Sequence, residues 1–119
     1  MILAAVDDLL FSSKIRATAK QVGIEVQFAR TPEAIMERAR ELRPALAIFD
    51  LNSGKTDPIA TIAALKRDPT TSDVPVIGFV SHVQVAVIEA AQHAGADQVL
   101  PRSAFAARLP EILMSAGAR

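Results

Sequence analysis

The composition of this 119-residue chain excludes several classes of protein. Half of its residues are apolar and none is cysteine, so the chain can bury a core without disulfides, and thiolate metal sites and cysteine nucleophiles are excluded. Thirteen basic and thirteen acidic residues balance, which removes the usual electrostatic basis for binding nucleic acid or a membrane. The first apolar run stops at Asp7, too early for a signal peptide or a membrane span. We therefore expect one cytoplasmic domain over residues 1–119, without nucleic-acid or membrane partners.

Strand and helix patterns alternate along the chain. Short apolar or alternating runs, typical of strands, occupy five stretches: residues 2–6, 24–29, 45–49, 74–80 and 98–100. Apolar residues recur at helical spacing after each of them: in residues 9–22, 32–43, 58–67 and 83–94, and from residue 109 onwards. We also expect Asp57 to cap the helix that Pro58 opens.

This alternation predicts an α/β fold. Five βα units imply a parallel five-stranded sheet with right-handed crossovers and helices on both faces. At this length the common solution is a flavodoxin-like three-layer sandwich, (βα)5, with strand order 2-1-3-4-5. In that order the first and third strands are neighbours, so reactive groups are expected at their carboxyl ends.

Three carboxylates follow these two strands. Asp7 and Asp8 come directly after the first apolar run, and Asp50 comes directly after the third. Asp50 should lie where its strand emerges, because an ionised carboxylate is unstable deep in a core. Adjacent acids alone are typical of a solvated helix start, but three carboxylates at one edge repel one another unless a cation joins them. Ligands that are all oxygen suit Mg²⁺, which is the predicted cofactor.

The chain resembles, over its whole length, the receiver domain of bacterial response regulators of the chemotaxis-regulator type. The resemblance rests on Asp7 and Asp8, on Asp50, and on Gly95-Ala96-Asp97 before the fifth strand. It implies that these three aspartates and the backbone carbonyl of Asn52 bind Mg²⁺. It also implies that Asp50 accepts a phosphoryl group from a sensor histidine kinase or a small phosphodonor. A stand-alone signalling protein of a two-component phosphorelay, rather than an enzyme, would then act by binding a downstream protein partner.

The positions that would contact the phosphate depart from the family pattern. The family's lysine after the fifth strand falls on Arg102, which keeps the charge but not the compact ammonium. The switch hydroxyl of the fourth strand falls on Val80, with Ser81 one place later, and the switch aromatic falls on Val99. We therefore expect an atypical receiver in which Arg102 contacts the phosphate and Ser81 is the candidate replacement hydroxyl. Without the switch pair, modification of Asp50 should change little beyond the neighbouring loops.

Two other functions stay open, and one is excluded. A pseudo-receiver would keep the fold as an interaction module without using the phosphate, and a metal-dependent phosphotransfer enzyme is a further alternative. The segment 53–56, Ser-Gly-Lys-Thr, is no nucleotide-binding loop, because Phe49 stands where that motif needs a glycine.

The helix over residues 83–94 is apolar nearly all round, so we expect it to form a partner or homodimer surface with the fifth strand and the last helix.

Overall fold

The computed structural model describes residues 1–82 and 84–117 of the chain. Within them, five parallel strands form one sheet in the order β2-β1-β3-β4-β5: β1 (Ile2–Ala5), β2 (Val26–Phe28), β3 (Leu46–Asp50), β4 (Val76–Val80) and β5 (Gln98–Pro101). The same residues form six helices: α1 (Leu9–Val22), α2 (Pro32–Leu42), α3 (Pro58–Arg67), α4 (Val85–Ala94), α5 (Arg102–Ala107) and α6 (Leu109–Gly117). The predicted flavodoxin-like α/β fold and its strand order are confirmed.

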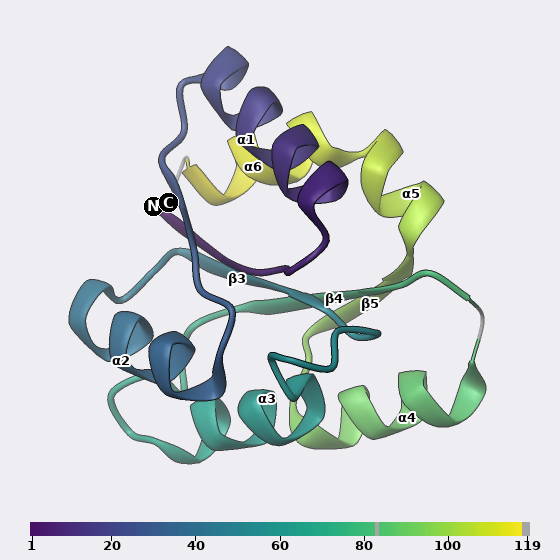
Figure 1. Cartoon of the computed structure of the whole chain (residues 1–119). Coiled ribbons are helices and arrows are strands. Elements are labelled where there is room, and N and C mark those ends of the chain that lie inside the picture. The colour runs from purple at the N-terminus through teal and green to yellow at the C-terminus, as the bar shows by residue number, and fades with distance from the viewer. Residues whose placement is uncertain (83, 118–119) are drawn as a thin grey trace.

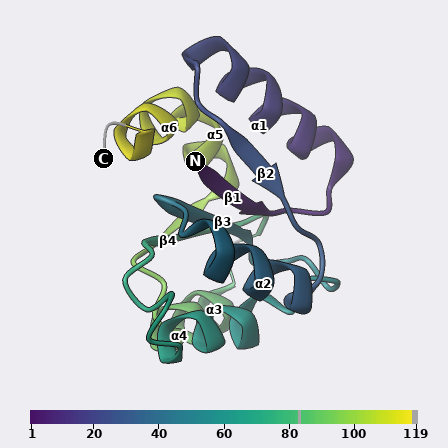
Figure 2. The same ribbon diagram turned by 90° about the vertical axis from the view of Figure 1, so that its left-hand side faces the viewer.

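The helices form two layers, one on each face of the sheet (Figure 1). Helices α1, α5 and α6 cover one face, and α2, α3 and α4 cover the other. Figure 2 shows β2 beside β1 at the border of the sheet, and its half-buried side chains fit the wetter edge strand that the alternating pattern predicts. Because all five strands are parallel, their carboxyl ends share one edge of the sheet.

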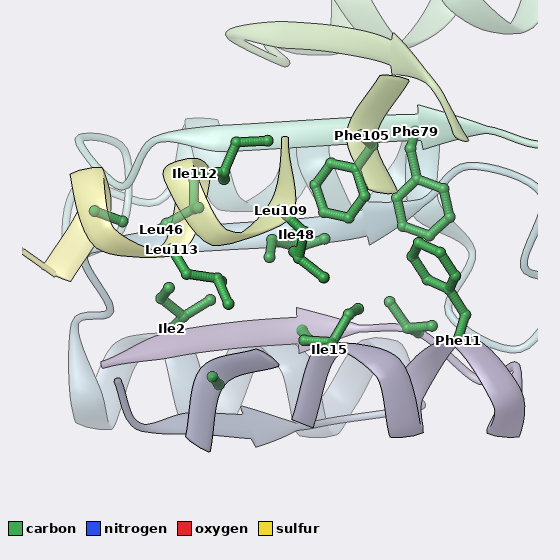
Figure 3. Close-up of a cluster of buried hydrophobic side chains, with 14 residues drawn as sticks. Ile2, Phe11, Ile15, Leu46, Ile48, Phe79, Phe105, Leu109, Ile112 and Leu113 are labelled. Atoms are coloured by element: carbon green, nitrogen blue, oxygen red, sulfur yellow. The ribbon is translucent and has the colours of Figure 1, made fainter. Parts of the chain in front are cut away.

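Two apolar clusters sandwich the sheet, because successive strand residues point to opposite faces. Along β3, Leu46 and Ile48 pack under α1, α5 and α6, whereas Ala47 and Phe49 pack under α2, α3 and α4. The first of these clusters is drawn in Figure 3. By the same alternation Asp50, which ends β3, falls on the face covered by α1, α5 and α6.

Three aromatic rings lie together in the first cluster, near the carboxyl ends of the strands. Phe79 of β4 has its ring centroid 4.9 Å from that of Phe11 in α1 and 4.9 Å from that of Phe105 in α5 (Figure 3). Such ring pairs add to the stability gained from burial alone. Phe105, fully buried, therefore anchors α5 at the edge where the acids emerge.

Helix α5 and the start of α3 differ from the sequence-based expectation. Residues 102–107 form α5, which the apolar spacing does not predict because so short a segment has a single buried residue, Phe105. Asp57 does stand at the N-cap position of α3, but the predicted side-chain cap is wrong. Its backbone is left-handed, with φ 43°, and its side chain makes no capping hydrogen bond.

The fourth helix begins later than predicted. Helix α4 starts at Val85 rather than at residue 83, and Val83 itself lies outside the described residues.

In the part of the chain that the structure describes, no helix has the length and apolar character needed to cross a membrane.

Candidate functional site

The carboxyl ends of β1 and β3 bring the three predicted acids to one edge of the sheet. The two strands pair in parallel so that Ala5 lies opposite Phe49. Asp50 is the next residue of β3, and Asp7 and Asp8 stand in the short loop after β1. The adjacency of these two strands is therefore what places carboxylates from distant parts of the sequence side by side.

Asp50 is nearly buried, with 7% of its surface exposed. Its Oδ1 accepts a hydrogen bond of 2.9 Å from the backbone N–H of Asn52. Burial is the main cause that raises the pKa of Asp50, and the negative charges of Asp7 and Asp8 raise it further, against the opposing effects of the Asn52 N–H and Arg102. A desolvated carboxylate with two acidic neighbours favours a proton or a nearby cation.

Asp8 is both the N-cap of α1 and the partner of Arg102. Its Oδ1 accepts the backbone N–H of Phe11 at 3.1 Å, and its Oδ2 accepts from Arg102 Nη2 at 3.2 Å. The Phe11 N–H is the main cause that lowers the pKa of Asp8, and Arg102 lowers it further. The helix-start role and the proposed site role therefore coexist in one side chain.

Arg102 reaches the acids from the first position of α5. Its guanidinium carbon lies 4.5 Å from the centroid of the Phe11 ring, so the cation packs on an aromatic face while it binds Asp8. A guanidinium held on both sides in this way is partly immobilised beside the carboxylates. A direct contact between Arg102 and a phosphoryl group stays a prediction.

The side chain of Asn52 joins two loops, which the sequence does not reveal. Its Oδ1 accepts from the backbone N–H of Ser81 at 2.8 Å, and its Nδ2 donates to Gln84 Oε1 at 3.0 Å. Ser81 directly follows β4, and Gln84 is the N-cap of α4. These partners belong to a different βα unit, so no local spacing in the sequence could indicate the contact. The sequence-based prediction used only the backbone carbonyl of Asn52, as a metal ligand.

A hollow of about 570 Å³ lies beside Asp8 and Arg102, where α1, the end of β4 and the start of α5 meet. Its lining residues are Phe11, Lys14, Val80, Ser81, Pro101, Arg102, Ser103 and Ala106. Ser81 is exposed and lines the same hollow as Arg102, and its role as a replacement hydroxyl stays a prediction. Val80 is buried in the apolar cluster under α2, α3 and α4, where it serves as core.

The acids share an edge without forming a ready metal cage. In the described residues, no three acidic or histidine side chains are gathered closely enough to hold a metal ion. At Asp8 each carboxylate oxygen already accepts one hydrogen bond, one from the Phe11 N–H and the other from Arg102. A cation at this edge would therefore compete with Arg102 for Asp8.

Comparisons with known proteins agree with this fold. The family model of the response regulator receiver domain matches residues 2–114. Among solved structures, the chemotaxis response regulator CheY4 of Vibrio cholerae is 17% identical with a TM-score of 0.82, and the match covers 97% of this chain and 96% of that one. No curated protein matches the sequence.

Two further structures carry specific states of their own. The Mn²⁺-bound form of the response regulator Rcp1 is 20% identical with a TM-score of 0.79, over 93% of this chain and 89% of that one. The phosphorylated cyanobacterial phytochrome response regulator RcpA is 24% identical with a TM-score of 0.75, over 96% and 88%. At these identities the structures establish the fold, whereas the family model spans nearly the whole sequence. The chain belongs to the response regulator receiver domains of two-component signalling.

Proposed function

We propose that this receiver domain accepts a phosphoryl group on Asp50 in a Mg²⁺-dependent reaction and signals by binding a downstream protein. The observation that carries the proposal is the setting of Asp50, a nearly buried carboxylate at the end of β3 whose pKa is raised by burial. The negative charges of Asp7 and Asp8 act on Asp50 from the same edge of the sheet, and the cation Arg102 stands beside Asp8. A carboxylate nucleophile beside oxygen ligands and a cation suits phosphoryl transfer.

In the proposed step a carboxylate oxygen of Asp50 bonds to phosphorus while the bond from phosphorus to the donor atom breaks. The donor atom is an oxygen in an acyl phosphate and an imidazole nitrogen in a phosphorylated histidine kinase. With acetyl phosphate as donor, acetate leaves and an aspartyl phosphate forms, with no net proton change. The protein's contribution is to hold the nucleophile and to offset charge on the transferring oxygens, and Arg102 is the cation that we assign to that second task.

Mg²⁺ fits the chemistry of the available donors, because these are all oxygen. We assign the ion to the carboxylates of Asp7, Asp8 and Asp50 and to the backbone carbonyl of Asn52. When bound, the ion would neutralise negative charge between the carboxylates and the incoming phosphoryl group. Burial is the main cause that raises the pKa of Asp50, and the negative charges of Asp7 and Asp8 raise it further. A divalent ion would offset these negative charges. The Mn²⁺-bound form of Rcp1 and the phosphorylated form of RcpA support the assignment by analogy.

The partners follow from the same proposal. The phosphodonor is a sensor histidine kinase or a small acyl phosphate, and the output is a protein that binds the surface of α4, β5 and α6. Val85 at the start of α4 is 63% exposed, so an apolar group is available there. The same surface would serve a homodimer.

A pseudo-receiver is the second candidate, and the state of Asp8 favours it. Each oxygen of this carboxylate accepts a hydrogen bond, and Arg102 already supplies a cation at the acidic edge. In such a protein the ion pair between Asp8 and Arg102 would take the place of the metal, and binding to the partner would not depend on Asp50.

The test is incubation with acetyl phosphate, with and without Mg²⁺, followed by intact mass measurement. We expect a gain of one phosphoryl group that requires Mg²⁺ and that Asp50→Asn abolishes. Asp57→Asn, which changes an exposed acid in the same loop, is the matched control and should be modified like the wild type. An unmodified wild-type protein under conditions that phosphorylate an established receiver would favour the pseudo-receiver.

A further inference from the structure

Asn52 is hydrogen-bonded both to the proposed phosphoacceptor and to the segment that leads into α4. Its backbone N–H donates to Asp50 Oδ1 at 2.9 Å. Its side chain accepts from the N–H of Ser81 at 2.8 Å and donates to Gln84 Oε1 at 3.0 Å. One residue therefore contacts the site of modification through its main chain and the neighbouring loop through its side chain.

The first turn of α4 is held on its inner side, where the half-buried Val87 and Ile88 pack on the apolar cluster, but its start is exposed. Gln84 occupies the N-cap position, but its side chain makes no capping bond and is paired with Asn52 instead. Val85 and Ala86 are exposed, and Ala91, much later in the helix, is the buried residue of α4. Among the described residues, the hydrogen bonds of Asn52 are the ones that fasten residues 81–84 to the loop after β3.

The positions that carry the switch in typical receivers cannot supply this connection here. Val80 is buried and Val99 is packed against the same apolar cluster, and neither side chain can form a hydrogen bond. From the sequence we therefore expect α4 to respond little to Asp50. The contacts of Asn52 change that expectation.

We infer that Asn52 couples the chemical state of Asp50 to the first turn of α4. The inference rests on the proposed function and names the route by which modification reaches the partner surface. The Asn52 N–H now bonds to a charged carboxylate oxygen, Oδ1 of Asp50. A phosphoryl group on Oδ1 makes that oxygen a poor acceptor, and one on Oδ2 leaves Oδ1 a neutral carbonyl, so the bond that positions Asn52 is weakened in either case. The amide side chain, which is bonded to Ser81 and Gln84, then either carries these two residues with it or releases them.

The coupling works because the two states differ in contacts, which is the requirement for any ligand-driven shift. In the unmodified protein Asn52 makes all three hydrogen bonds together. After modification the main-chain bond is weaker, so the position of Asn52 that satisfies all three bonds is less favoured. Ser81, Gln84, Val85 and Ala86 are exposed and have room to adjust, whereas the strands beneath them are buried.

The test uses beryllofluoride and Mg²⁺ as the probe, with two readouts on the whole chain. Fluorine NMR measures beryllofluoride bound at the site, and amide chemical shifts of residues 85–88 measure the response of α4. The variants are Asn52→Leu and Gln84→Leu, compared at equal bound fraction with the wild type. Gln92→Leu, which changes an exposed glutamine at the other end of α4, is the matched control.

We expect clear shifts at residues 85–88 in the wild type and in the control, and their loss in Asn52→Leu and Gln84→Leu. If beryllofluoride binds to the wild type but the amide shifts of residues 85–88 do not change, the coupling is overturned while the proposed function stays intact. Shifts that persist in both test variants would also overturn it. Absence of bound fluoride would instead refute the proposed function and the coupling with it. Amide spectra without the probe confirm that each variant is folded.

Discussion

At the scale of single residues, the ionisation of Asp50 opposes folding. Burial raises its pKa in the folded state, so the ionised form is less stable in the native protein than in the unfolded chain. This cost is absent below the unfolded pKa, and it grows as pH rises through the folded value. A carboxylate placed in this way is maintained at the expense of stability.

Asp50→Asn should therefore stabilise the protein at neutral pH. The amide keeps the shape of the side chain and can still accept the Asn52 N–H, but it carries no charge. We expect a gain on the order of 1 kcal/mol at about pH 7 that disappears below about pH 4. Urea unfolding at the two pH values measures it, with the exposed Asp57→Asn as control. A variant no more stable than the wild type at neutral pH would show that Asp50 is not a desolvated charge.

The pair of Asp8 and Arg102 has the opposite pH dependence. The Phe11 N–H, and then Arg102, lower the pKa of Asp8, so the pair stabilises the fold above the unfolded pKa. That contribution is lost as pH falls through the folded pKa. Both side chains are 36% exposed, so solvent screening keeps the ion pair weak.

Arg102→Ala should destabilise the protein by roughly 1 kcal/mol at about pH 7 and by less at about pH 3. The remainder at low pH is the contact of the guanidinium with Phe11, which does not depend on Asp8. Lys14→Ala removes an exposed cation from the same hollow and is the matched control. Equal destabilisation of Arg102→Ala at both pH values would mean that the stem of the side chain acts by packing alone.

At the scale of elements, α4 is distinguished by how little of it is buried. Its sequence is apolar, yet Ala91 is the buried residue and Val85 at its start is largely exposed. An apolar helix that leaves side chains in solvent is typical of an interaction surface. The exposed turn is also the one that Asn52 holds through Gln84.

A charge at Val85 should separate surface from core. Val85→Asp is expected to leave the free energy of unfolding within about 0.5 kcal/mol of the wild type while weakening self-association or partner binding. Ala91→Asp, which buries a charge on the same helix, should unfold the protein. Sedimentation velocity and urea unfolding give the two readouts. Loss of the fold in Val85→Asp would place that residue in the core and contradict the proposed surface.

At the scale of the whole molecule, the sequence was sufficient for the architecture but not for the contacts between loops. Apolar runs and helical spacing predict the sheet, its order and the common edge of Asp7, Asp8 and Asp50, because these depend on periodicity and topology. Helix α5 is not predictable in this way, since one buried residue, Phe105, gives no apolar stripe.

The contacts that define the site come from residues far apart in the sequence. Asn52 meets Ser81 and Gln84 across two βα units, and Arg102 meets Asp8 across nearly the whole chain. Such pairs follow from the exact positions of loops, which composition and spacing leave undetermined. The predicted cap at Asp57 failed for a related reason, because the loop before α3 forces a left-handed backbone there.

The central claim is that Asp50 carries the phosphoryl group, and the most direct measurement is to locate the modification. After reaction with acetyl phosphate and Mg²⁺, borohydride reduces an aspartyl phosphate to homoserine with release of phosphate, and peptide mass spectrometry then finds the changed residue. We predict homoserine at position 50 alone, and none when Mg²⁺ is withheld. Homoserine at Asp7, Asp8 or Asp57, or at no position in protein treated with Mg²⁺ and the donor, would contradict the account.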